Sequence, residues 1–391
     1  MKPSARRLDH LTGLRGVAAY SVLIAHAVAH VLIWEKQLPF SLATCMEQLA
    51  YMGMSTFFVL SGFVIHYNYA HLFQVRPFFE ACRHFFAARF ARLYPLYALA
   101  IVLVSIDDHV LGRRLGALLI YVFVAASWFN EEMLVYPLAW SISTEAFFYY
   151  AFALAAPFLW RIRRPLLWLI ISLVALPAAF LLISSWKGLY PLLGTLFWHD
   201  DKASAGVEGW FGYFSPYVRI GEFFFGMLTS AVYLRWGEKV PLRRGAIRLL
   251  EAAAFCWCLA LLLLAIHTQW PVGRLSYNYA FAPALVIIML VGCSDVSILG
   301  PALRLPLVVY AGEISYSVYI WQWWAEMRMK DVAVGPLPSV SGYAMAAEKM
   351  LAIIVATTMM AYVSYHLYER PMRLLLRTAL MQPMPRRRPA G

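Results

Sequence analysis

The stretch LRGVAAYSVLIAHA, residues 14–27, places two ionisable side chains inside an apolar segment long enough to cross a membrane. Arg15 and His26 are eleven residues apart, and eleven steps of about 100° bring both to nearly the same face of an α-helix. The helical rise between them is about 16 Å, roughly half the hydrocarbon thickness of a bilayer. Ionisable groups at such depth are costly and usually face a bundle interior or a water-filled cavity. We therefore expect Arg15 at the membrane edge, His26 near mid-membrane, and chemistry between them.

The composition of the chain is that of a membrane protein. Of its 391 residues, 62% are hydrophobic and 14% are charged, whereas soluble domains average about 45–50% and about 25%. Apolar segments of about 17–23 residues recur to the end of the chain, which predicts an all-α, polytopic integral membrane protein. The net charge of +12 comes from basic residues near helix ends. The positive-inside rule explains them, so the predicted environment is a lipid bilayer and no nucleic-acid partner is expected.

Eleven apolar segments can be counted along the sequence. They are residues 11–33, 49–68, 93–107, 115–129, 138–159, 166–184, 217–234, 248–267, 278–294, 309–326 and 344–366. The clusters of arginine and lysine fall on one side of the membrane only if one segment does not cross. The short segment 115–129 is the best candidate. The prediction is about ten transmembrane helices plus one short re-entrant or interfacial helix, with both termini cytoplasmic.

Several motifs resemble those of the membrane-bound acyltransferase family 3. LDHLTGLRGVAAYSVLIAHA (8–27) looks like the first helix of that family, with its Arg-x10-His pair. FFVLSGFVI (57–65), RFARLYPLY (89–97) and WSISTEAFFYY (140–150) are similar to the motifs of its second, third and later helices. GEISYSVYIWQ (312–322) and YERP (368–371) match the late helices. The matches follow the family order from residue 8 to about 373.

The resemblance implies a transmembrane acyltransferase domain over residues 1–375, followed by a short basic cytoplasmic tail, 376–391. Members of the family O-acylate surface polysaccharides, lipids and small molecules. The implied activity is transfer of an acyl group, acetyl in the first instance, from cytoplasmic acyl-CoA to a hydroxyl of a cell-surface glycan or its lipid-linked precursor. The implied location is a bacterial inner membrane. Acetyl-CoA or another acyl-CoA would be a donor substrate, and no permanently bound cofactor is expected.

His26 is the predicted general base or acyl relay. A histidine of near-neutral pKa can take the proton of an acceptor hydroxyl, and Arg15 on the same face can stabilise charge near the thioester. Glu145 lies inside the segment 138–159, where an unpaired carboxylate is expensive. It is expected to pair either with His26 or with an arginine. For His26 and Glu145 a structural role remains the alternative to catalysis.

Arg89 and Arg92 are the predicted donor-binding residues. They are three residues apart and so share a helix face. Guanidinium groups suit phosphates, and coenzyme A carries three phosphate groups. Topological anchoring is the alternative role of both arginines.

Six further residues are predicted to support the substrate or the structure. They are Trp140, Ser61, Ser315, Tyr316, Tyr319 and Glu369. The family commonly carries a histidine where this chain has Gln322, whose amide can hydrogen-bond but cannot titrate. No His, Asp or Glu cluster has metal-ligand spacing, so no metal site is predicted.

Two other functions remain open at this stage. One is acylation of a small molecule by the same chemistry. The other is transport, with Arg15, His26 and Glu145 forming a proton or solute path through the bundle.

Overall fold

The computed structural model describes most of the chain. The described residues are 8–32, 40–107, 115–129, 136–159, 161–186, 188–198, 204–236, 240–264, 271–330, 332 and 340–381. Residues 382–391, most of the predicted basic tail, lie outside these ranges, as do the first seven residues.

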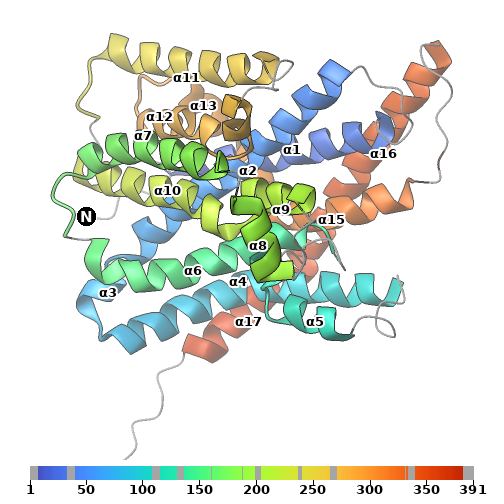
Figure 1. The fold of residues 1–391 in the computed structure, drawn as a ribbon, viewed down its shortest axis with the longest axis horizontal. Coiled ribbons are helices and arrows are strands. Elements are labelled where there is room, and N and C mark those ends of the chain that lie inside the picture. The colour runs from blue at the N-terminus through green and yellow to red at the C-terminus, as the bar shows by residue number, and fades with distance from the viewer. Residues whose placement is uncertain are drawn as a thin grey trace, which may run out of the picture.

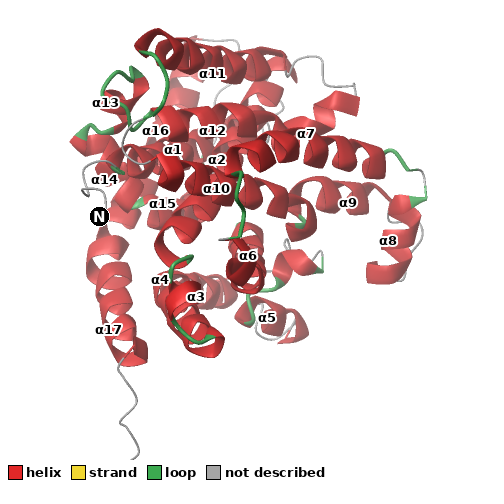
Figure 2. Cartoon of the chain, turned by 90° about the vertical axis from the view of Figure 1, so that its left-hand side faces the viewer, coloured by secondary structure: helices red, strands yellow, loops and turns green. Residues whose placement is uncertain are grey.

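The described residues form helices and contain no β-strand (Figures 1 and 2). The α-helices are α1 (Asp9–Leu32), α2 (Phe40–Tyr69), α3 (Leu72–Val75), α4 (Phe78–Asp107), α5 (Leu115–Val122), α6 (Ala139–Leu159), α7 (Pro165–Ser184), α8 (Leu189–Trp198), α9 (Ser204–Gly209), α10 (Pro216–Trp236), α11 (Arg244–Leu264), α12 (Ala282–Val291), α13 (Leu299–Leu303), α14 (Pro306–Glu313), α15 (Ser315–Arg328), α16 (Val340–Ser364) and α17 (Arg370–Met381). Short 3-10 helices are η3 (Ala126–Trp128), η6 (Pro271–Tyr277) and η7 (Tyr279–Phe281), and π-helical turns are η4 (Trp210–Phe214) and η8 (Tyr365–Glu369).

Within the described ranges, seven helices are long and apolar enough to cross a membrane. They are Asp9–Val31, Thr44–Val75, Phe78–Ile106, Ala139–Leu159, Pro165–Ser184, Arg244–Leu263 and Gly342–Met381. The prediction of an all-α, polytopic membrane protein is thus confirmed. The other predicted spans are less regular: α10 carries a buried ion pair, and the segments 278–294 and 309–326 are each divided between two helices. The number ten stays a prediction.

The segment 115–129 is too short to cross as a helix. Its eight-residue helix α5 is about 12 Å long. The chain then turns at Val124 and continues through η3 toward α6. The hydroxyl groups of Tyr97 and Tyr94 on α4 donate to the carbonyl oxygens of Tyr121 and Val122 at the end of α5. These hydrogen bonds give the two carbonyl oxygens partners that lipid hydrocarbon could not supply. They hold the end of α5 against α4.

Helix α2 runs through the middle of the bundle and packs most extensively against α10. The contact depends on two glycines. A Cβ at Gly62 would overlap the carbonyl oxygen of Phe223, and one at Gly226 would overlap that of Val59. Small residues of this kind let membrane helices approach backbone to backbone. Because Gly62 directly follows Ser61, this close approach also fixes the position of the Ser61 side chain.

One end of the bundle gathers the turns that carry arginine. The turn between α3 and α4 and the turn between α6 and α7 lie on the same side of Figure 1 as the last residues of α10. Arg235 at the end of α10 donates a hydrogen bond to the carbonyl oxygen of Arg163 in the α6–α7 turn. We call this side, with Arg76, Arg163 and Arg235, the basic end.

The last helix extends beyond the predicted domain boundary at residue 375. Helix α16 continues through η8 into α17, which ends at Met381. In η8 the N–H of Arg370 bonds to the carbonyl oxygen of Tyr365, five residues back. Pro371 has no N–H to donate to the helical backbone hydrogen bonds, and the π-turn just before it changes the hydrogen-bonding pattern there. The helix therefore passes through Pro371 and beyond residue 375. The domain boundary at residue 375 stays a prediction.

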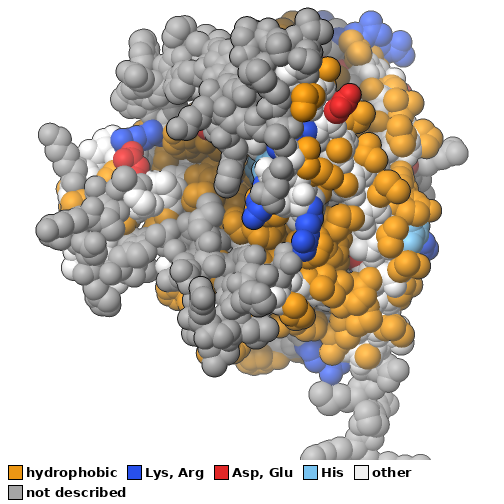
Figure 3. Space-filling view, turned by 90° about the vertical axis from the view of Figure 1, so that its right-hand side faces the viewer, with side chains coloured by type: hydrophobic (Ala, Val, Ile, Leu, Met, Phe, Trp, Pro, Cys, Tyr) orange, Lys and Arg blue, Asp and Glu red, His pale blue; other side chains and the backbone are white. Residues whose placement is uncertain are grey.

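The outside of the bundle is apolar. In the apolar 18-residue stretch of α7 and in that of α11, only 17% of the residues are buried inside the protein. Most side chains of both helices are nevertheless hydrophobic. Exposed apolar helix surfaces of this kind are stable against lipid rather than water. Figure 3 looks onto the end of the bundle opposite the basic end, where the coloured part is also largely hydrophobic but carries Lys or Arg side chains near its middle.

The replacement Gly62→Ala is expected to destabilise the protein by about 1–3 kcal/mol, because the added methyl group forces α2 and α10 apart. The melting temperature of the purified full-length protein in detergent measures this. Gly206→Ala is the matched control, since a Cβ at Gly206 meets nothing within 4 Å. Equal melting temperatures for the two variants would contradict the account of the α2–α10 contact.

Candidate functional site

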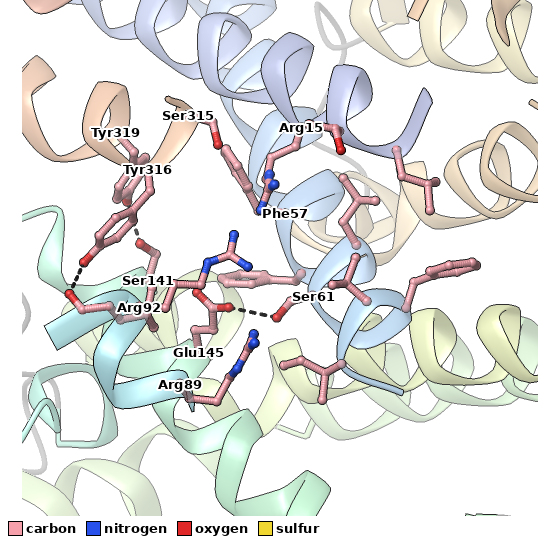
Figure 4. A pocket seen from close by; sticks show the side chains of 18 of the residues that line it. Arg15, Phe57, Ser61, Arg89, Arg92, Ser141, Glu145, Ser315, Tyr316 and Tyr319 are labelled. Carbon is pink, nitrogen blue, oxygen red and sulfur yellow. Dashed lines mark hydrogen bonds between the residues drawn. The ribbon is translucent and has the colours of Figure 1, made fainter. Parts of the chain in front are cut away.

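Three arginines and one carboxylate meet in a cavity of about 280 Å³ near the basic end. We call it the basic cavity. It is lined from five helices by Arg15 (α1), Ser61 (α2), Arg89 and Arg92 (α4), Glu145 (α6), and Ser315, Tyr316 and Tyr319 (α15), among others. Figure 4 shows the three arginine side chains converging on the space around Glu145 and Ser61. Tyr67 and Asn68, in the last turn of α2 before the basic end, also line it.

Glu145 is held in place by two hydroxyl groups. Its Oε1 accepts hydrogen bonds from Ser61 Oγ at 2.9 Å and from Tyr149 at 2.8 Å. Tyr149 is four residues further along α6, so it lies on the same helix face. Among the described residues, Glu145 is the only acidic one that lines the cavity. It therefore offsets part of the charge of three guanidinium groups and leaves the cavity positive.

The arginines have hydrogen-bonding capacity to spare. Arg89 donates from Nη2 to the hydroxyl of Tyr69 at 2.7 Å, and its guanidinium lies 4.7 Å from the centre of the Tyr69 ring. In the described part of the chain, the buried Nε atoms of Arg89 and Arg15 have no hydrogen-bond partner. Arg15 also lies within electrostatic range of Arg92, Glu145, Glu369 and Arg89. Clustered guanidinium groups with unused donors suit an anionic ligand, and phosphate in particular.

His26 lies in a second cavity of about 340 Å³, which we call the histidine cavity. His26 Nδ1 is 4.0 Å from Glu326 Oε1 on α15. The imidazole is 33% exposed and the carboxylate only 9%, so a ligand in the cavity reaches the histidine first. Glu326 Oε1 has no hydrogen-bond partner among the described atoms. A small adjustment would let it accept the imidazole N–H, an arrangement that orients a histidine base.

Aromatic rings form much of the wall of the histidine cavity. They come from Tyr51, Trp140, Tyr213, Phe214, Tyr319 and Trp323. Aromatic walls with a few polar groups are typical of sites for organic ligands. Burial raises the pKa of the Tyr213 hydroxyl, which lies on η4 outside the long helices, so this group stays protonated and can donate.

A buried ion pair supports this aromatic wall from behind. Arg219 Nη1 lies 3.0 Å from Glu222 Oε2 on α10, and both side chains are fully buried. The Arg219 guanidinium is 5.0 Å from the centre of the Tyr213 ring and 6.0 Å from that of Trp140. Such cation–π contacts are stronger when the cation is removed from water. The pair therefore fixes the two rings relative to α10.

In the described ranges, two side chains line both cavities. They are Met54 on α2 and Tyr319 on α15. The Tyr319 hydroxyl accepts a hydrogen bond from Ser141 Oγ at 2.7 Å and donates to the carbonyl oxygen of Leu138 at 3.2 Å. The basic and histidine cavities are thus neighbours, separated by a tyrosine that α6 holds in position.

The predicted site residues therefore divide between the two cavities. Arg15, Glu145, Arg89, Arg92, Ser61, Ser315 and Tyr316 line the basic cavity, His26 and Trp140 line the histidine cavity, and Tyr319 lines both. Glu369 lines neither, and it accepts a hydrogen bond from Ser317 Oγ at 2.6 Å on the buried side of η8.

The expectation that Glu145 pairs with His26 or with an arginine is met in neither form among the described residues. The Glu145 carboxylate accepts hydrogen bonds from Ser61 and Tyr149 and lies in the same cavity as three arginines. Glu145 and His26 lie in different cavities, and the carboxylate beside His26 is that of Glu326. Sequence analysis missed Glu326, because it took this residue as the end of the apolar segment 309–326. It also missed Arg219 and Glu222. The available signal was the same for all three: ionisable side chains within or next to apolar segments.

Gln322 is fully buried on α15, four residues before Glu326. Neither its amide nitrogen nor its amide oxygen has a hydrogen-bond partner in the described part of the chain. Among the described residues, no group of three or more His, Cys, Asp or Glu side chains is placed to hold a metal ion.

Comparison with known proteins agrees with the motifs. The family model described as "Acyltransferase domain" matches residues 8–369. Acyltransferase MdmB of Streptomyces mycarofaciens is 26% identical over 336 residues, which are 82% of this chain and 79% of that protein. Protein 2 in picA locus of Rhizobium radiobacter is 38% identical over 98 residues, 24% of this chain and 42% of that protein. No solved structure matches the chain. With its family domain spanning nearly all of an all-α membrane bundle, the chain belongs to the membrane acyltransferase family and is an acyltransferase.

Proposed function

We propose that the protein transfers the acyl group of acyl-CoA, bound in the basic cavity, to a hydroxyl of an acceptor bound in the histidine cavity. The observation that carries this proposal is the pair of adjoining cavities with different chemistry. One is positive and has unused guanidinium donors, and the other joins two histidines and two carboxylates, among them His26 and Glu326, to aromatic walls. Met54 and Tyr319 line both cavities.

The donor fits the basic cavity by charge. Coenzyme A carries three phosphate groups, and Arg15, Arg89 and Arg92 offer charge-assisted hydrogen bonds to such groups. The sequence predicts acetyl-CoA as the donor. The basic end would face the cytoplasm of a bacterial cell, with both termini on that side, in accordance with the positive-inside rule. Acyl-CoA would then enter from the cytoplasm with its thioester directed toward Tyr319.

In the transfer step, His26 takes the proton of the acceptor hydroxyl as the hydroxyl oxygen attacks the thioester carbonyl carbon. A carbon–oxygen bond forms and the carbon–sulfur bond breaks. The CoA thiolate leaves, and it is neutralised by the proton that His26 has taken. Glu326 stabilises the imidazolium formed on the way. Transfer is direct in this scheme and needs no acyl-enzyme.

The acceptor is proposed to be a cell-surface glycan or its lipid-linked precursor. The aromatic rings and few polar groups of the histidine cavity suit a neutral ring that carries hydroxyl groups. A small molecule with such a ring would use the same site. Transport, the other function left open by the sequence, is not proposed, because the family is one of acyltransferases.

His26→Ala is expected to lower acyl transfer by about 10²–10⁴-fold, the usual contribution of a general base. Glu326→Gln should lower it less, since the base remains but its imidazolium loses a carboxylate. The measurement is the mass of surface glycans from cells that lack the wild-type protein and express each variant. The exposed His71 is the control, replaced by alanine. Full acylation by His26→Ala at normal expression would remove His26 from the mechanism.

Arg92→Ala is expected to weaken binding of CoA about tenfold or more, because a hydrogen bond to a charged group contributes about 1.5–3 kcal/mol. The dissociation constant of CoA from the purified protein measures the change. Arg89→Ala should act in the same direction. Arg76→Ala is the matched control, since Arg76 is exposed and pairs with Glu80. Unchanged affinity in the first two variants would assign both arginines to topology alone.

A further inference from the structure

A third cavity opens on the side of the bundle, between α4, α6 and the turn that follows α5. It encloses about 630 Å³, and we call it the lateral groove. Its lining is apolar or aromatic apart from one charged residue, Arg89. Phe90, Leu93, Val124, Ala146 and Tyr150 are representative of the wall. None of the chemistry proposed above uses this space.

The outer rim of the lateral groove faces the surroundings of the bundle. Phe123 is 77% exposed, and Tyr150, Phe90 and Val122 are each between 43% and 54% exposed. In a membrane protein, large exposed hydrophobic side chains on a helix bundle face lipid. The groove thus opens sideways toward hydrocarbon, not toward water at either end of the bundle.

The inner end of the lateral groove adjoins the basic cavity. Arg89, Leu93 and Ile142 line both spaces. Arg89 is 8% exposed, and its Nε has no hydrogen-bond partner in the described part of the chain. A ligand whose anionic part lies in the basic cavity therefore has an apolar space directly beside it, with these three side chains between the two.

The turn that closes the groove is held in an unfavourable backbone conformation. Val124 has a φ of 55°, which is rare for a β-branched residue and costs about 1–3 kcal/mol. Backbone hydrogen bonds from Val124 N–H to Tyr121 O and from Ala125 N–H to Ile120 O keep it there. The strain is retained at the point where the turn forms a wall of the groove, as is common at ligand sites.

We propose that the lateral groove binds the hydrocarbon chain of the transferred acyl group, so that the enzyme accepts acyl-CoA donors longer than acetyl-CoA. This inference rests on the proposed function, because it needs CoA in the basic cavity. The alternative occupant is the tail of a bilayer lipid. The three residues shared with the basic cavity favour the donor, because they place the apolar groove directly beside the site proposed for CoA.

The test compares acetyl-CoA with octanoyl-CoA as competitors of radiolabelled CoA, using the full-length protein in lipid nanodiscs. Burying a methylene group tightens binding on the order of fourfold, so octanoyl-CoA is expected to bind at least tenfold tighter than acetyl-CoA. Ala146→Trp fills the groove, so this variant should bind octanoyl-CoA and acetyl-CoA with similar affinity. Leu154→Trp, an exposed position of α6 outside the groove, is the matched control and should keep the preference for octanoyl-CoA.

A second variant keeps the test decisive if Ala146→Trp does not fold. Val124→Gly suits the positive φ and widens the groove, so it is expected to raise the affinity for dodecanoyl-CoA relative to octanoyl-CoA. Equal affinities of acetyl-CoA and octanoyl-CoA in the wild type would overturn the inference while leaving the proposed function intact. A second result would also overturn the inference: a phospholipid that co-purifies with the wild type but not with Ala146→Trp, while the variant keeps the preference for octanoyl-CoA over acetyl-CoA. That result would assign the groove to a lipid tail. Failure of CoA itself to bind would instead overturn the proposed function.

Discussion

The carboxylate of Glu145 is the charge on which the arrangement of the basic cavity depends. Three arginines inside a membrane bundle repel one another and lose hydration, and both effects are expensive where water is scarce. Glu145 offsets part of that cost and is held by Ser61 and Tyr149 in the position where it does so. It does not neutralise the cavity, and the remaining positive charge is what an anionic donor can use. A fully balanced cluster would stabilise the bundle but bind no phosphate.

The packing of the helices and the chemistry of the site are linked through neighbouring residues. Gly62 brings α2 against α10, and the preceding Ser61 thereby reaches Glu145 on α6. On α10 itself, Arg219 and Glu222 support the aromatic wall of the histidine cavity. The same three helices therefore shape both cavities. A change in the α2–α10 contact is therefore expected to alter the geometry of the site as well as the stability of the protein.

Sequence reasoning predicted the fold class and all the charged residues that the described part of the chain contributes to the basic cavity. Apolar segments, basic helix ends and the spacing of Arg89 and Arg92 depend on local sequence, so they are readable without a structure. Pairings between distant helices are not: Glu145 and Glu326 are both acidic residues in or near apolar segments, and only tertiary packing decides which one lies beside His26. The last helix continues beyond the apolar segment 344–366, and the π-turn that accommodates Pro371 leaves no clear mark in the sequence.

The division of the site explains how one helix can carry both Arg15 and His26. Although both lie on α1, one faces a charged space and the other a space with aromatic walls, and Tyr319 stands between them. In the proposed function, the division also gives each substrate its own binding space. A structure of the full-length protein in nanodiscs with CoA bound tests this most directly. The account predicts phosphate density beside Arg15, Arg89 and Arg92, with the thiol directed toward Met54 and Tyr319. CoA bound in the histidine cavity, or outside the bundle, would contradict it.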